Sequence, residues 1–179
     1  QTIGSWTEAL GAKQPTPGGG AAAAVAAAIG AASGAMAAIY TTRKKDVESG
    51  VAEEAKALAE SLNKAATTCL LAADEDAAAY AALQRTWKKD WDSVGTAEDK
   101  ARIEAEALEV PVRLLKLCHE QAKAIAAFLP RCNPNITSDA KVALHLLAGA
   151  GRCAFQTVLV NNPSAELKKE LRLLFLELG

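Results

Sequence analysis

The stretch that decides the fold is Gly18–Tyr40, GGGAAAAVAAAIGAASGAMAAIY. It lies within a longer segment, Gln14–Thr42, that has no charged residue. Alanine is the best helix former, and a helix that is uncharged on every side needs neighbours that shield it from water. Its length and basic flanks also fit a transmembrane helix, but alanine and glycine are only weakly hydrophobic. We therefore predict a helix buried inside a soluble bundle, and no membrane span.

The composition of the whole chain agrees with an all-α fold. Of the 179 residues, 41 are alanine, only 15 are valine or isoleucine, and 4% are aromatic. Sheets favour β-branched and aromatic residues, so an all-β or α/β fold is disfavoured. The length suits one domain, and neither a repeat nor a long linker divides residues 1–179. The prediction is a single-domain helical bundle around a buried, alanine- and glycine-rich central helix.

Prolines, asparagines and capping residues separate further helices along the chain. Pro111 falls inside one of them, and there we expect a kink or a restart of the helix. Several helices have more than one apolar face, which predicts a homodimer or a larger homo-oligomer. In addition to the central helix, we expect helices over residues 3–11, 49–87, 96–129, 137–160 and 164–178.

Charge and cysteine content exclude several classes of function. The formal net charge of −1 disfavours a nucleic-acid binder. The four cysteines form no Cys-x-x-Cys pair and there are only two histidines, so the usual ligand spacing of a zinc site is missing. Free thiols suit a reducing compartment. We expect a cytoplasmic protein without a metal ion or cofactor.

Asp76 is a carboxylate on the apolar face of the long helix, one turn from Ala73 and from Tyr80. A carboxylate that faces a core must be paired, hydrogen-bonded or catalytic, because burying it bare is costly. Burial raises the pKa of such a group, which suits a general base or acid near neutral pH. The alternative is a structural aspartate that binds a helix end or a buried cation.

Three other features have both a structural and a functional interpretation. Asp139 lies in the first turn of a predicted helix, where backbone amides favour a negative charge in any case. The segment Pro17–Gly20 exposes backbone N–H groups at the start of the central helix, but no P-loop sequence follows. The basic run Arg43–Lys45 follows the end of that helix. It is either a solvated helix end or an anchor for a ligand that carries a carboxylate.

Taken together, these segments resemble the cyclodeaminase–cyclohydrolase family, in the same order and over nearly the whole chain. The family comprises the C-terminal domain of formimidoyltransferase-cyclodeaminase and free-standing methenyltetrahydrofolate cyclohydrolases. Departures at Ala21, Arg43 and Thr157 leave open a non-catalytic module for folate binding or assembly. The segments that carry the resemblance are Pro15–Gly20, Thr41 with Lys44 and Lys45, Asp74–Tyr80, Pro111, Asn133–Ala143 and Asn161.

The resemblance implies a helical, usually dimeric enzyme that acts on a folate. The expected reaction is hydrolysis of 5,10-methenyltetrahydrofolate to 10-formyltetrahydrofolate, with Asp76 as base and acid. Asp139 is expected to orient water or balance the cationic substrate, and Lys44 and Lys45 to meet the glutamate tail. The alternative reaction is that of a cyclodeaminase, which converts 5-formiminotetrahydrofolate to the methenyl compound and ammonia. The residues that the resemblance assigns to the substrate are Thr16, Pro17, Gly18, Gly19, Gly20, Thr41, Lys44, Lys45, Tyr80 and Asn161.

Overall fold

The structure is a computed structural model that describes residues 2–179, and these residues form seven α-helices, three short 3-10 helices and no strand. The predicted all-α fold is therefore confirmed. The α-helices are α1 (Ile3–Gly11), α2 (Gly19–Ile39), α3 (Lys44–Glu48), α4 (Val51–Thr86), α5 (Ala97–Phe128), α6 (Thr137–Val160) and α7 (Ala165–Glu177). The 3-10 helices are η1 (Trp91–Ser93), η2 (Leu129–Arg131) and η3 (Pro134–Ile136).

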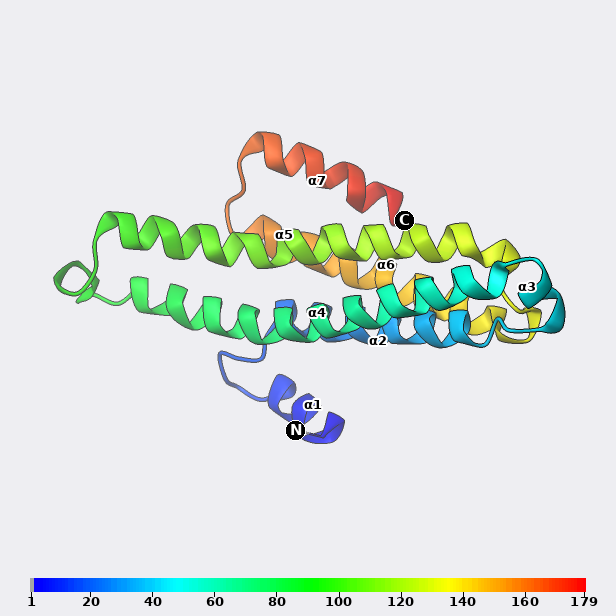
Figure 1. Ribbon diagram of the computed structural model, residues 1–179. Coiled ribbons are helices and arrows are strands. Elements are labelled where there is room, and N and C mark those ends of the chain that lie inside the picture. Colours follow the sequence, from blue (N-terminus) through cyan, green and yellow to red (C-terminus); the bar gives the residue numbers. More distant parts are fainter. Residues whose placement is uncertain (1) are drawn as a thin grey trace.

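Four of these helices, α2, α4, α5 and α6, form an antiparallel bundle (Figure 1). Helix α2 packs against α4 and α6, and α5 closes the bundle on the opposite side. Gly20 near the start of α2 lies against Asp76 of α4, whereas Gly34 near its end lies against Leu62 of α4 and Ile125 of α5. At one end, α4 and α5 continue beyond α2 and α6 as a hairpin that contains η1 (Figure 1).

The uncharged helix α2 is the central helix of the bundle, as predicted. Twelve of its 21 residues are buried, and all twelve are alanine or glycine. A Cβ at Gly34 would lie 2.6 Å from Ile125 Cδ1, so a larger residue there would force the Ile125 side chain of α5 to shift. In the described part of the chain, two helical stretches, Gly19–Ile39 and Pro134–Val160, are long and apolar enough to cross a bilayer. A helix in the core of a soluble bundle passes the same test, and 56% of the α2 window is buried.

Helix α5 continues through Pro111 without a break, so the restart that the sequence allowed does not occur. A proline inside a helix removes one backbone hydrogen bond and costs about 3 kcal/mol. The two halves of α5 are held by tertiary packing on both sides of the proline, because Val110, Leu114 and Leu115 are all buried. A second difference is α3, a short helix before α4 that the sequence did not predict.

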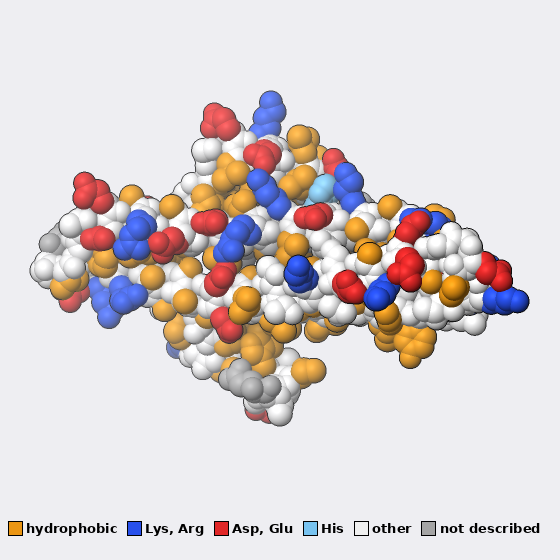
Figure 2. All heavy atoms as spheres, in the orientation of Figure 1, with side chains coloured by type: hydrophobic (Ala, Val, Ile, Leu, Met, Phe, Trp, Pro, Cys, Tyr) orange, Lys and Arg blue, Asp and Glu red, His pale blue; other side chains and the backbone are white. Residues whose placement is uncertain are grey.

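The remaining helices lie outside the bundle (Figure 1). Helix α7 packs on α5 and α6 through the fully buried Leu171. Helix α1 has no buried residue. The outer face of α2 also stays exposed, and its large side chains there are Ile29, Met36 and Ile39. Figure 2 shows charged side chains spread over α4 and α5, and apolar ones gathered along the edge at which α1 and α2 lie.

Candidate functional site

Asp76 of α4 caps the start of α2. The N-cap residue of α2 is Gly18, which has no side chain to satisfy the first backbone N–H groups of the helix. Asp76 replaces that missing cap, because its Oδ2 accepts a hydrogen bond of 3.0 Å from the Ala21 N–H. The positive end of the helix dipole also favours a carboxylate at this place. One residue thus joins two helices that are 55 positions apart in the sequence.

Gly20 makes this contact possible. A Cβ built on Gly20 would lie only 2.0 Å from Asp76 Oδ1 and 2.6 Å from its Cγ. Any side chain at position 20 would therefore push the carboxylate away from the end of α2. The structural alternative for Asp76, an aspartate bound to a helix end, is present in the structure, but the contact uses only one of its two oxygens.

The Asp76 carboxylate also lines a cavity of about 410 Å³ between the start of α2, the second half of α4 and the end of α6. The lining is mainly apolar, and among the described residues that line it Asp76 is the only charged one. Two aromatic side chains, Tyr80 of α4 and Trp87 directly after its end, meet edge to face with their ring centres 6.0 Å apart. The lining residues are Pro15, Thr16, Gly18, Gly19, Gly20, Asp76, Ala79, Tyr80, Leu83, Trp87, Ala107, Thr157, Val160 and Asn161.

The surroundings of Asp76 raise its pKa above the usual value of an aspartate. Burial is the larger influence, and the hydrogen bond from the Ala21 N–H acts in the opposite direction. A carboxylate with a raised pKa holds a proton more readily than an exposed one. Such a group is suited to general acid and base catalysis.

Asn161, just beyond the end of α6, is fixed by its own amide group. Its Nδ2 donates hydrogen bonds to the backbone oxygens of Thr157 (3.0 Å) and of Ala107 in α5 (3.3 Å). The Thr157 hydroxyl donates to the backbone oxygen of Ala154 at 2.8 Å. These contacts hold α5 and the end of α6 together where both line the cavity.

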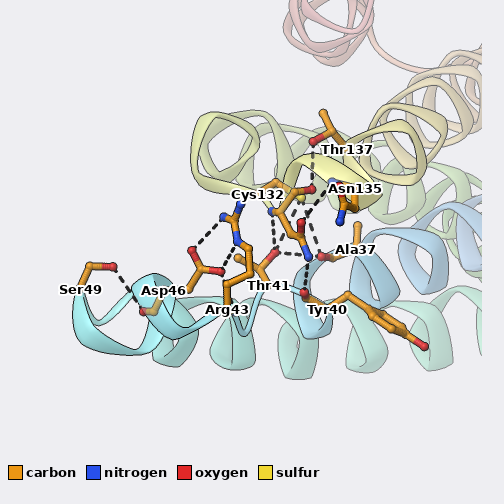
Figure 3. Close-up of polar contacts among 10 residues, drawn as sticks. Ala37, Tyr40, Thr41, Arg43, Asp46, Ser49, Cys132, Asn135 and Thr137 are labelled. Atoms are coloured by element: carbon orange, nitrogen blue, oxygen red, sulfur yellow. Dashed lines mark hydrogen bonds and ion pairs between the residues drawn. The ribbon is translucent and has the colours of Figure 1, made fainter.

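A second group of the predicted residues lies at the opposite end of α2 (Figure 3). Helix α2 has 21 residues, so its ends are about 30 Å apart. Thr41 is fully buried there, and its hydroxyl donates to the Ala37 oxygen (3.2 Å) and accepts from the Asn133 N–H (3.0 Å). Arg43 forms a two-fold hydrogen-bonded ion pair with Asp46, at 2.7 and 2.9 Å. This network ties α2 and α3 to the loop before α6.

Lys44 and Asp139 are also at this end, away from the cavity. The Lys44 ammonium is exposed and lies 3.8 Å from Glu48, and Asp139 accepts a hydrogen bond of 3.2 Å from the Ser138 hydroxyl. Asp139 is in the first turn of α6, whereas the cavity is lined by the last turn of that helix. A single chain therefore does not bring Asp139, Thr41, Lys44 or Lys45 to Asp76, and their assignment to the substrate stays a prediction.

The other predicted site residues do come together. Thr16, Gly18, Gly19, Gly20, Asp76, Tyr80 and Asn161 all line the cavity, and Pro17 lies in the same loop. Sequence reasoning missed Ala107 and treated Thr157 only as a departure from a motif. Thr157 lies one helical turn before Asn161, and this spacing is the signal that could have placed it in the site.

A family model described as "Formiminotransferase-cyclodeaminase" matches residues 2–172. The chain belongs to the formiminotransferase-cyclodeaminase family. The resemblance drawn from the sequence motifs is thereby confirmed. Residues 2–172 include every helix that lines the cavity, so the Asp76 site lies wholly within the part of the chain that matches the formiminotransferase-cyclodeaminase family.

The fold agrees with that of a solved structure. A crystal structure of formiminotetrahydrofolate cyclodeaminase from Thermotoga maritima is similar, with a TM-score of 0.85 and 22% sequence identity. The match covers 99% of this chain and 88% of that one. No curated protein sequence matches the chain significantly. At this level of sequence identity, the structural match shows that the two chains share a helical fold. It does not show which substrate this member of the formiminotransferase-cyclodeaminase family uses.

The described residues contain no group of three or more histidine, cysteine or acidic side chains arranged to hold a metal ion. All four cysteines are free thiols: Cys69, Cys118 and Cys132 are buried and Cys153 is exposed. Burial raises the pKa of the Cys69 thiol to about 11, so it stays protonated and unreactive at neutral pH.

Proposed function

We propose that the chain is a methenyltetrahydrofolate cyclohydrolase, which hydrolyses 5,10-methenyltetrahydrofolate to 10-formyltetrahydrofolate. The observation that carries the proposal is the Asp76 carboxylate, which has a raised pKa and lines a largely apolar cavity without a lysine or arginine. The substrate has a flat ring system and a positive charge shared between N5, the bridge carbon and N10. Apolar walls with a single negative charge fit such a heterocyclic cation.

In the proposed mechanism, Asp76 first acts as a general base. It removes a proton from water as the water oxygen attacks the electrophilic bridge carbon, and a neutral hydroxy adduct forms. Asp76 then returns this proton to N5 and the bond between N5 and the bridge carbon breaks. The adduct hydroxyl loses its proton to solvent and becomes the formyl oxygen on N10. The balance is one water consumed and one proton released for each substrate cation.

The test is a direct assay with a matched inactive variant. The purified chain is expected to accelerate the loss of methenyl absorbance, with one proton released per turnover. Asp76→Asn keeps the size of the side chain and an oxygen that can accept from the Ala21 N–H, so it should fold and lose this acceleration. Folded Asp76→Asn protein that turns over at the wild-type rate would refute the mechanism. Binding of reduced folates by the wild type without turnover would instead support a non-catalytic module.

A second candidate reaction uses the same cavity. The similar protein from Thermotoga maritima is titled a formiminotetrahydrofolate cyclodeaminase. In that reaction, N10 attacks the formimino carbon and ammonia leaves, which again needs one group that donates a proton. Measurement of ammonia release from 5-formiminotetrahydrofolate, beside the hydrolysis assay, would distinguish the two reactions.

We also propose that the functional unit is a cytoplasmic homodimer. The exposed face of α2, with Ile29, Met36 and Ile39, has no charge along its whole length and suits a second copy of the chain. In a two-fold symmetric dimer with antiparallel copies of α2, the Lys44 end of one copy would lie near the cavity of the other. This arrangement would supply the glutamate tail with cations that the cavity lacks. The free thiols support a reducing compartment.

Sedimentation of single variants tests the dimer. Ile29→Glu introduces a charge on the exposed face of α2 and should give monomers. Val94→Glu, at a position that is 74% exposed in the α4–α5 hairpin, is the matched control and should leave the dimer intact. A wild-type chain that sediments as a monomer at micromolar concentration would refute this part of the proposal.

A further inference from the structure

The side chain of Asn161 has a fixed orientation in the cavity. Both hydrogens of its amide group have partners, because Nδ2 donates to the backbone oxygens of Thr157 and Ala107. These two acceptors determine which end of the amide is nitrogen and which is oxygen. Oδ1 therefore points away from both carbonyls and forms no hydrogen bond with a described residue.

This oxygen is not fully buried. Among the described side chains, the fully buried polar atom without a hydrogen-bond partner is Gln121 Oε1, and Asn161, which is half-buried, does not have such an atom. Asn161 lines the cavity together with Asp76, whose Oδ1 likewise has no partner. An unpaired acceptor in a largely apolar cavity favours a ligand that brings a donor to it, because both groups lose water when the ligand binds.

We propose that Asn161 is a specificity-determining residue: its fixed Oδ1 accepts a hydrogen bond from an N–H of the pterin ring and thereby orients the ring relative to Asp76. The inference rests on the proposed function, since it takes a reduced folate as the ligand. The donors proposed to meet this oxygen are the 2-amino group and the N8–H of the reduced pterin. An amide oxygen selects for these donors and against ring systems that present an acceptor at the same place.

The test is the coupling between a change in the protein and a change in the ligand. Binding of 5-formyltetrahydrofolate, which the proposed reaction does not consume, is compared with that of its 2-desamino and 8-deaza analogues. Loss of the N–H that meets Asn161 should weaken binding to the wild type about 3- to 10-fold, the range of one net hydrogen bond. In Asn161→Ala the same ligand change should have no further effect.

A conservative variant separates this effect from a purely structural one. Asn161→Asp loses both anchoring donors, as Asn161→Ala does, but keeps an oxygen acceptor. Both variants should lower the melting temperature, whereas only Asn161→Asp should keep the discrimination between the ligands. Equal discrimination in the wild type and in Asn161→Ala, for both analogues, would overturn the inference and leave the proposed function standing. A wild-type chain that binds no reduced folate would overturn both.

Discussion

The contact between Gly20 and Asp76 leads to a quantitative prediction for the substitution Gly20→Ala. A methyl group at position 20 would lie 2.0 Å from Asp76 Oδ1, and real Cβ atoms do not approach other atoms more closely than about 3.0 Å. The carboxylate must therefore retreat by about 1 Å. This displacement breaks the 3.0 Å hydrogen bond from the Ala21 N–H to Asp76 Oδ2. We expect Gly20→Ala to destabilise the fold through the loss of this one contact.

The magnitude follows from two opposing contributions. Loss of a hydrogen bond to a charged acceptor costs about 1.5–3 kcal/mol. Replacement of a helical glycine by alanine gains roughly 0.5–1 kcal/mol. The free energy of unfolding should therefore fall by about 1–2 kcal/mol. In an Asp76→Ala background the atoms in the clash are gone, and Gly20→Ala should then stabilise the fold by up to about 1 kcal/mol.

The assay is urea unfolding of the four proteins of this cycle at pH 7 and at one protein concentration, since a dimer would make stability concentration-dependent. The expected coupling energy between the two positions is about 2 kcal/mol. It is the sum of the destabilisation by Gly20→Ala in the wild type and the stabilisation by Gly20→Ala in the Asp76→Ala background. Gly19→Ala is the matched control, because a Cβ at Gly19 meets no atom within 4 Å and should not destabilise either background. A coupling energy below about 0.5 kcal/mol would refute the reasoning.

Three further predictions concern other parts of the molecule. Because burial raises the pKa of Asp76, the native state binds its proton more tightly than the unfolded state does. The free energy of unfolding of the wild type, relative to that of Asp76→Asn, should therefore fall as the pH rises from the pKa of the unfolded state, about 3.9, through the pKa of the native state. An opposite slope with pH in urea unfolding would contradict this. Thr41→Val removes the fully buried hydroxyl that accepts from the half-buried Asn133 N–H and should cost about 1–3 kcal/mol. Thr42→Val at the next, exposed position should cost less than about 0.5 kcal/mol. Leu171→Ala should lower the free energy of unfolding by about 2–5 kcal/mol, because Leu171 is the fully buried residue by which α7 packs on the bundle. Thermal or urea unfolding measures this, and a cost below about 1 kcal/mol would show that α7 contributes little to the fold.

Local sequence patterns predicted the helices well because their determinants are close together in the chain. The segment Ala97–Asp99 is a clear example, since Thr96 caps it and forms a capping box with Asp99, as the sequence indicates. Pro111 shows the limit of such reasoning. Its local effect disfavours a continuous helix, but the buried Val110 and Leu114 on either side hold one together.

The candidate site was predictable only in part. Asp76 stood out because a carboxylate on an apolar helical face needs a reason, and Gly18–Gly20 stood out as an uncapped helix start. Neither pattern predicts that the two meet, since residues 20 and 76 become neighbours only when α2 and α4 pack antiparallel. Their contact, the cavity beside it and the fixed amide of Asn161 are properties of the packed bundle.

By itself, the sequence determined the all-α fold and the burial of α2, because helix propensity and the absence of charge act within a few residues of each other. The tertiary structure decided which of the motif residues share a site. Thr41 and Asp139 belong to the same ordered set of motifs as Asp76, yet the length of α2 keeps them at the far end of the chain's bundle. Helices are rigid over their whole length, so the order of motifs along a chain does not fix their distances in space.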